Sequence, residues 1–402
     1  MNNLFHLVSP LRRAFLLLSA LVAATTASAN DSGYATYGNM LIPFVSTDIA
    51  VDKEILTIRL TDEGKTYIDV DYTFINRSSE EKTILMGFEA DPGYPGVMEI
   101  TDNGHPEIYD FTVVMNGSRI TPKTSVVLLD KDDNVIDRKP IDVTKYVYQD
   151  FRRVVKKGNE ENYEAESWGY AFVYSFNATF KPGENHIHHT YNYQNGAAVM
   201  ENYFLTYKLS PAARWAGGSI RDFTLRITAP NTAKHFFLET EFVQKQDPKI
   251  VSGVAKFRNK SKKYEWEESP NNTHYYKEIS MRDATLEWHL TNYSPKKELE
   301  IKSADGFYTN YYTGDAISSP TAYYDRSCGI YWLWMNQENY NAQQRRLIRN
   351  LPYASRGYVF KDAALRKHFN NLWWYMPDPS YNPDDASDLT DRERELISTY
   401  KK

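Results

Sequence analysis

The chain has 402 residues, with 47 Lys and Arg against 52 Asp and Glu, a formal net charge of −5 and one cysteine. A mildly acidic chain without a long basic run is unsuited to binding nucleic acid or anionic lipid, because neutralising phosphates requires clustered Lys and Arg. Aromatic residues make up 14% of the chain, including 31 tyrosines, which favours β-strands and ligand-facing surfaces alike. The length suffices for two domains, or for one large all-β domain with an appendage.

The first 29 residues have the pattern of a removable secretory signal. Arg12 and Arg13 precede an uncharged apolar run over 14–24, and Ala27-Ser28-Ala29 forms an A-x-A cleavage site. The apolar run is too short to cross about 30 Å of hydrocarbon, so we expect a protein without a transmembrane segment, exported to the periplasm or outside the cell. No cysteine stands directly after the predicted cleavage site, which predicts that there is no lipid anchor. Cys328 has no second cysteine with which to form an internal disulfide.

Residues 30–302 alternate apolar and polar positions in the way that half-buried strands do. The alternation is clear over 66–74, 223–227 and 284–290, and turn signals such as Asn116-Gly117 separate such runs. This pattern predicts a large antiparallel β-sandwich region, built as one large or two packed β domains. A parallel sheet is not expected, because no run of helical period lies between the strands.

The period is lost over 303–338 and becomes helical over 339–402. We interpret 303–338 as a connector between domains, in which a last strand pair remains an alternative. In the final segment, 342–350 favours a helix, Asp362 can cap a second, and a capping box at Thr390 begins a third. The predicted fold class is therefore mainly β, with a small α-helical domain at the C-terminal end.

The final segment carries a recognisable motif. Arg345–Asn350 is followed by Tyr353-Ala354-Ser355-Arg356-Gly357, and then by Trp374-Tyr375 and the helix start at Thr390. In order and spacing these residues resemble a YARHG domain. The family's central Arg-His pair stands here as Ser355-Arg356, and Pro352 interrupts a position that is usually helical, so we expect the first helix to stop before Pro352 or to restart there.

The YARHG resemblance implies a small extracytoplasmic module that binds at the cell envelope and has no catalytic role. Candidate ligand-binding residues in this module are Tyr353, Arg356, Tyr358, Trp373 and Trp374. Packing of the two tryptophans in the core of a small domain is the stronger interpretation, because such a domain has little else to bury.

The β region is similar, more loosely, to a family of bacterial secreted domains of unknown function. The shared features are the exported start, Tyr72–Asn76, Gly87–Glu89, Asn116-Gly117 and Tyr203–Thr206 with Trp215. This second resemblance implies no activity.

The chain shows no local motif of an enzyme, and we predict no cofactor. The best metal candidates are His186 and His188, because alternation on a strand places both on one face about 7 Å apart. No third ligand is evident in the sequence, and a solvent-facing strand is the stronger interpretation. No catalytic residue is assigned, although a catalytic pair can assemble from distant strands.

Three functions remain open. The first hypothesis is an exported, non-enzymatic envelope protein that binds cell-wall glycan or an envelope protein through its β region and its YARHG-like module. The alternative is a secreted hydrolase of polysaccharide or peptide that the C-terminal module localises. A chaperone-like role in envelope assembly is the third. The sequence leaves the ligand and the oligomeric state undetermined.

Overall fold

The computed structural model describes most of the chain from residue 37 to residue 401. The gaps are 45–46, 94–107, 130–134, 142–145, 150–152, 157–162, 167–168, 199–200, 264–272, 305–320, 323, 325, 327–339 and 385. The predicted signal at 1–29, Cys328 and most of the predicted connector lie outside the described residues. Within the described part, no helix is long and apolar enough to cross a membrane.

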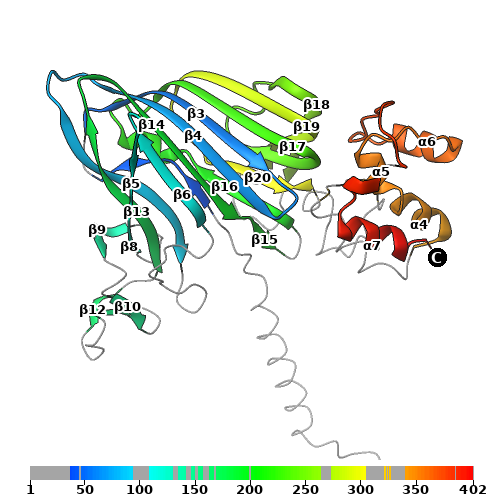
Figure 1. The fold of residues 1–402 in the computed structure, drawn as a ribbon, viewed down its shortest axis with the longest axis horizontal. Coiled ribbons are helices and arrows are strands. Elements are labelled where there is room, and N and C mark those ends of the chain that lie inside the picture. Colours follow the sequence, from blue (N-terminus) through cyan, green and yellow to red (C-terminus); the bar gives the residue numbers. More distant parts are fainter. Residues whose placement is uncertain are drawn as a thin grey trace, which may run out of the picture.

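Most of the strands belong to one twelve-stranded sheet (Figure 1). Its main path runs through β1 (Tyr37–Asn39), β16 (Glu201–Lys208), β20 (Leu299–Ser303), β17 (Ile220–Glu239), β3 (Ala50–Leu60), β4 (Lys65–Asn76), β14 (Gly183–Gln194), β6 (Ile108–Met115) and β7 (Ser118–Ile120). Three further strands join it: β15 (Gly196–Ala198) on β16, β19 (Thr273–Tyr293) on β17, and β18 (Lys249–Lys263) on β19.

Two smaller sheets complete the β region. The five-stranded sheet contains β2 (Ile42–Pro43), β5 (Lys82–Gly93), β13 (Gly169–Phe180), β8 (Lys123–Leu129) and β9 (Val135–Ile141). The three-stranded sheet contains β10 (Tyr146–Gln149), β11 (Arg153–Lys156) and β12 (Tyr163–Glu166). A short 3₁₀ turn, η1 (Ser210–Arg214), follows β16.

The alternation of side chains explains how the two larger sheets pack. On β4, Ile68, Val70 and Tyr72 are buried, whereas Asp69 and Asp71 between them are exposed, as the period of two requires. The buried face meets the five-stranded sheet through aromatic pairs, such as Phe88 with Tyr191 at 4.7 Å and Phe74 with Phe180 at 5.5 Å. The predicted β-sandwich is confirmed.

Two strand pairs depart from the expected antiparallel arrangement. β3 pairs β17 in parallel, with Leu56 opposite Leu225, and β1 pairs β16 in parallel. Among the described residues between the two strands, no α-helix joins β3 to β17. The chain instead passes through the intervening strands of both large sheets before it returns, so the absence of a helical period between neighbouring strands did not exclude parallel pairs.

The C-terminal domain is helical, as predicted, and its first helix stops before Pro352, as expected. It contains α4 (Ala342–Ile348), α5 (Leu351–Ser355), α6 (Ala363–Asn370), the 3₁₀ turn η3 (Ala386–Asp388) and α7 (Asp391–Thr399). α4 ends before Pro352, which lies in the first turn of α5, where its missing N–H costs nothing. Asp362 caps α6 and a capping box at Thr390 begins α7, as expected.

The core of this domain is aromatic. Phe360, Phe369, Trp374 and Tyr375 are buried there. Tyr324, from the predicted connector, packs into the same cluster and donates a hydrogen bond to Glu393 at 3.1 Å. Tyr324 of the predicted connector is therefore part of the helical core.

Candidate functional site

The outer face of the large sheet carries two neighbouring polar grooves over β4 and β14, with volumes of about 410 and 260 Å³. The larger groove is lined by side chains of β3, β4, β6, β14 and β17, among them Arg59, Tyr67, Asp69, Asp110 and Asn192. Both grooves lie on the face opposite the sandwich core, which is the face that alternation leaves to solvent. We refer to the two grooves together as the outer-face groove.

In the larger groove an aromatic ring lies against a planar cation, and a similar pair is formed by Lys65 and Tyr109 outside the groove's lining. The Arg59 guanidinium lies 4.2 Å from the ring centre of Tyr67, and the Lys65 ammonium lies 4.9 Å from the ring centre of Tyr109. Asn192 donates a hydrogen bond to Asp110 at 3.0 Å. This surface therefore presents ring faces held in place by cations, beside carboxylate and amide groups that can bind hydroxyls.

The two candidate metal ligands lie at the smaller groove, but the structure gives them different partners. His188 Nε2 lies 3.2 Å from Asp69 Oδ1, and one ligand atom each of Asp69, Asp71 and His188 lie within 4.8 Å of one another. His186 is instead 3.4 Å from the hydroxyl of Thr73. Carboxylate oxygens and one imidazole are a donor set for a divalent cation, and the two aspartates are candidate ligands that sequence reasoning missed.

The aspartates could have been found from the strand pairing. Register places His188 directly opposite Asp71 and Thr190 opposite Asp69, so the three side chains share one face. The sequence shows the alternation of each strand, but not which residue faces which across two strands that are more than a hundred positions apart.

The opposite face of β3 buries a carboxyl group. Glu54 is fully buried at a position of the inner face otherwise taken by Leu56, Ile58 and Leu60. Its neighbour across the pair is Tyr72, and neither group makes a hydrogen bond of ordinary geometry. Burial raises the pKa of Glu54 to about 8, and the Tyr72 hydroxyl opposes this only in part. The signal that sequence reasoning missed is an acidic residue, Glu54, at a position where the alternation of β3 otherwise places apolar residues.

The predicted ligand residues of the YARHG-like module lie in three environments. Tyr353 and Tyr358 are half-buried, with ring centres 6.5 Å apart. Arg356 is buried and makes hydrogen bonds to the Glu393 carboxylate at 2.8 and 2.9 Å, to the Pro352 carbonyl at 2.7 Å and to Asp388. These contacts give Arg356 a structural role inside the domain.

The two tryptophans are also engaged by the protein. Trp374 is buried and donates from Nε1 to the Thr321 carbonyl at 2.9 Å. The Trp373 ring is half-buried, lies 4.3 Å from the guanidinium carbon of Arg258 and stands 5.8 Å from the ring of His235. The structure thus brings Trp373 onto the large sheet and leaves neither indole as a flat, exposed platform.

The backbone of this tryptophan segment docks on β18 and β19. Lys256 donates to the carbonyls of Trp373 at 3.2 Å and Tyr375 at 2.8 Å, Ser280 donates to the Trp374 carbonyl at 3.1 Å, and Arg282 donates to the Met376 carbonyl at 2.7 Å. Four successive carbonyls therefore accept hydrogen bonds from sheet side chains. We call this set of contacts the carbonyl ladder of 373–376.

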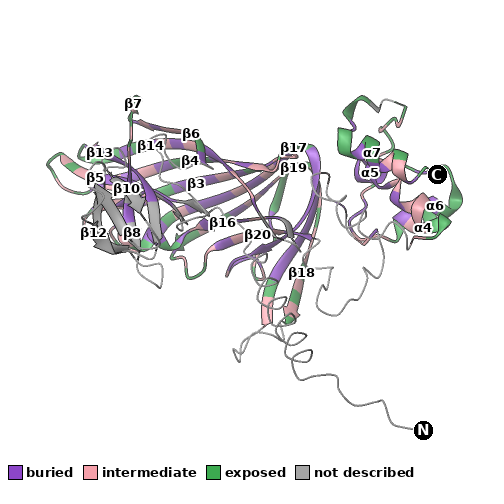
Figure 2. Cartoon of the chain, turned by 90° about the horizontal axis from the view of Figure 1, so that it is seen from below, coloured by how far each residue is buried: buried purple, intermediate pink, exposed green. Residues whose placement is uncertain are grey.

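Docking of the C-terminal domain explains why one stretch of the sheet is buried on both faces. From residue 232 to residue 240, β17 and its continuation are buried at every position (Figure 2). One face of this stretch packs in the sandwich core, and the other face, with His235 and the partner strand's Glu278, lies under the C-terminal domain.

Comparison with known families confirms both resemblances seen in the sequence. Residues 334–402 match the YARHG domain, and residues 29–201 match a domain of unknown function, DUF4424. No curated protein matches the sequence.

Among solved structures, the chain is similar to a candidate nutrient-binding protein of Legionella pneumophila, with 20% identity over 92% of this chain and 99% of that chain and a TM-score of 0.49. It is also similar to an M1 zinc metallopeptidase of Deinococcus radiodurans, with 9% identity over 65% of this chain and 43% of that chain and a TM-score of 0.22.

Proposed function

We propose that this protein is an exported, non-enzymatic binding protein of the cell envelope that holds cell-wall glycan in the outer-face groove. The observation that carries the proposal is the composition of that groove, where Tyr67 lies with Arg59, Asp110 and Asn192. Lys65 of β4 and Tyr109 of β6 form a second cation–aromatic pair. Sugar rings present apolar C–H faces that stack on aromatic rings, while their hydroxyls require planar donors and acceptors.

The YARHG domain supports an envelope role for the same chain. In this proposal it acts as a module fixed to the sheet by the carbonyl ladder of 373–376 and presents its remaining surface to the envelope. An envelope protein remains the other partner class that such a surface fits.

The test is retention of the full-length protein on purified peptidoglycan, together with a glycan array. We expect Tyr67→Ala and Tyr109→Ala each to weaken binding about three- to tenfold, the value of one aromatic contact of roughly 0.5–1.5 kcal/mol. The matched control is Tyr275→Ala, which removes a tyrosine that is 55% exposed on β19, away from the groove. The proposal fails if the wild type is retained on no envelope fraction, or if Tyr67→Ala and Tyr109→Ala both bind as well as the control.

The alternative is a secreted hydrolase, which one observation supports. Asp69 and Asp71 bring carboxylate oxygens within 4.8 Å of each other beside His188, and paired carboxylates are the usual machinery of glycoside hydrolysis. Both aspartates are exposed on an open sheet face, whereas catalytic sites are typically concave and desolvated. Release of reducing ends from peptidoglycan by the wild type, abolished in Asp71→Asn, would establish the hydrolase instead.

A further inference from the structure

A second polar cavity, of about 350 Å³, lies where the large sheet meets the YARHG domain. The sheet contributes the bend of β17 at 231–233 together with Arg282 and Asp283 of β19. The YARHG domain contributes Ser355-Arg356 of its motif and the loop that carries Tyr381. The volume falls in the range of small-molecule sites, roughly 300–1,000 Å³, which occur preferentially between domains.

Charges of both signs line this cavity in equal number. The cations are the guanidinium groups of Arg282, Arg326 and Arg356, and the anions are the carboxylates of Asp283, Asp378 and Asp388. Arg356 is already held by Glu393 and Asp388. Arg282 donates to the Met376 carbonyl and lies 3.5 Å from Asp378. The groups offered to a ligand are therefore Arg326 Nε and the remaining donors of Arg282 on the cationic side, and Asp283 and Asp378 on the anionic side.

Two buried donors lack hydrogen bonds among the described residues. Arg326 is 9% exposed and donates from its two Nη atoms to the carbonyls of Asn231 at 3.0 Å and Asp388 at 2.8 Å. Its Nε makes no hydrogen bond, with the nearest carboxylates of Asp62 and Glu393 at 3.6 and 3.7 Å. The Tyr381 hydroxyl is likewise buried without a partner. A buried donor left unpaired costs about 1–3 kcal/mol, so such groups mark places where a ligand or water completes the structure.

We propose that the cavity binds a small zwitterion, such as a free amino acid or a dipeptide. The ligand's carboxylate would accept from Arg326 Nε and Arg282, and its ammonium group would pair with Asp283 and Asp378. A balanced lining opposes a multiply charged anion or cation, because either would be repelled by the lining charges of its own sign. Since the lining comes from both domains, the ligand also ties the YARHG domain to the sheet.

The experiment is isothermal titration of the full chain with four small probes: L-alanine and L-alanyl-L-alanine as zwitterions, N-acetyl-L-alanine as the anion, and L-alanine methyl ester as the cation. We expect at least one zwitterion to bind at least about tenfold more tightly than either singly charged probe, because each of these lacks one ionic contact. Bound zwitterion should also raise the thermal midpoint.

Two conservative variants keep the test independent of folding. Tyr381→Phe removes only the unpartnered hydroxyl. Asp283→Asn keeps the left-handed backbone at this position, with φ of 47°, and the bond accepted from the Asn231 amide, because asparagine adopts that conformation readily. Each should weaken zwitterion binding about tenfold, whereas the outer-face variant Tyr67→Ala should leave it unchanged. Absence of zwitterion binding, equal binding of a singly charged probe, or insensitivity to both variants would overturn the inference without affecting the glycan proposal.

Discussion

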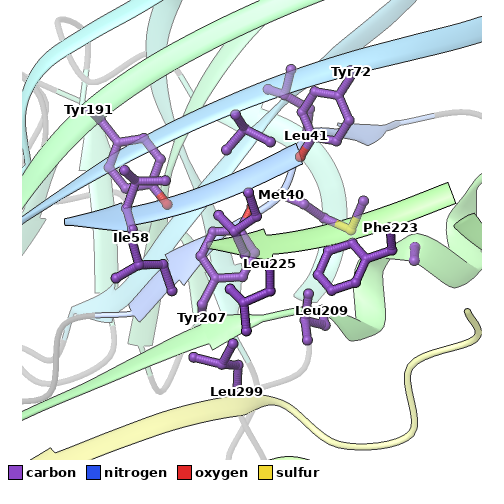
Figure 3. Close-up of a cluster of buried hydrophobic side chains, with 14 of the residues drawn as sticks. Met40, Leu41, Ile58, Tyr72, Tyr191, Tyr207, Leu209, Phe223, Leu225 and Leu299 are labelled. Atoms are coloured by element: carbon purple, nitrogen blue, oxygen red, sulfur yellow. The ribbon is translucent and has the colours of Figure 1, made fainter. Parts of the chain in front are cut away.

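At the residue scale, the most consequential feature is a carboxyl group placed inside the sandwich. Glu54 lies opposite Tyr72 on β4 and beside Phe223 on β17. Both of these aromatic residues are among the largest fully buried side chains of the core (Figure 3). Burial raises the pKa of Glu54 to about 8 from an ordinary value of 4.5. The folded protein therefore holds this group protonated at a pH where the unfolded chain ionises it.

The sign of the resulting pH dependence follows directly. Stability from this group is fully present below about pH 4.5 and is lost as the pH rises toward about 8. At pH 7 the loss is on the order of 3 kcal/mol, at 1.36 kcal/mol for each pH unit above 4.5. We expect Glu54→Gln to flatten the dependence between pH 4.5 and 8, as measured by urea unfolding at several pH values. Glu63→Gln, in an exposed turn, should retain the wild-type slope.

A second residue-scale feature is the buried ion pair of the YARHG motif. Glu393 is fully buried; burial alone would raise its pKa, but Arg356 outweighs this and lowers it. Removing Arg356 would leave that carboxylate with only the more distant Arg326, whose Nε lies 3.7 Å away, whereas the pair between Arg346 and Asp362 lies in solvent.

The two arginines form a matched comparison. We expect Arg356→Met to destabilise the protein by about 3–5 kcal/mol, because the buried Glu393 carboxylate loses the guanidinium that is hydrogen-bonded to it. Arg346→Met should cost less than about 1 kcal/mol, as exposed pairs do. Chemical denaturation of both variants at pH 7 measures the difference, and equal losses would show that Arg356 does not have the structural role described above.

At the element scale, the docking of the YARHG domain depends on a close approach between its motif and β19. Gly357 has φ of 86°, a left-handed conformation that favours glycine. A Cβ atom at this position would come within 2.4 Å of Arg282 Nη1 and 2.7 Å of the Met376 carbonyl oxygen. The motif glycine therefore serves both the turn and the carbonyl ladder of 373–376.

The effect of the left-handed backbone can be separated from the effect of the close approach by comparing Gly357 with a second glycine. Gly217 has nearly the same φ, 85°, and open space around its Cβ direction. Both Gly→Ala changes should cost about 1 kcal/mol of backbone strain. Gly357→Ala should in addition speed hydrogen exchange across 363–376, because the added Cβ would displace the Arg282 guanidinium that holds the Met376 carbonyl. Exchange in that segment no faster than in Gly217→Ala would contradict the proposed close approach.

At the scale of the whole molecule, one side chain from the predicted connector joins the two domains. Arg326 donates to Asn231 on the sheet and to Asp388 in the YARHG domain. Together with the carbonyl ladder of 373–376, this arrangement predicts that the β region and the helical domain unfold as one unit.

Calorimetry can test this coupling. We expect a single transition for the wild type and two transitions for Arg326→Gln, because hydrogen bonds to charged groups contribute about 1.5–3 kcal/mol each and two are lost across the junction. The control Lys361→Gln changes an exposed cation of the same domain and should retain one transition. Two transitions already in the wild type would show that the domains unfold independently.

Much of the fold was accessible from local patterns. Alternation in 66–74 and in 284–290 predicted strands that are found in β4 and β19, and the cap residues Asp362 and Thr390 begin helices as expected. Pro352 was expected to interrupt a helix and lies in the first turn of α5. Such features depend on residues within one turn or one strand, so the sequence alone determines them.

The candidate sites were decided by tertiary structure. Asp69 and Asp71 join His188 only because β4 pairs β14, and Arg282 meets Arg356 only because the YARHG domain docks on β19. The sequence by itself determined a mainly β chain with a helical YARHG domain, because periodicity and caps are local. Which charges share a groove or a cavity depends on strand register and domain docking, and both are set by contacts between residues far apart in the chain.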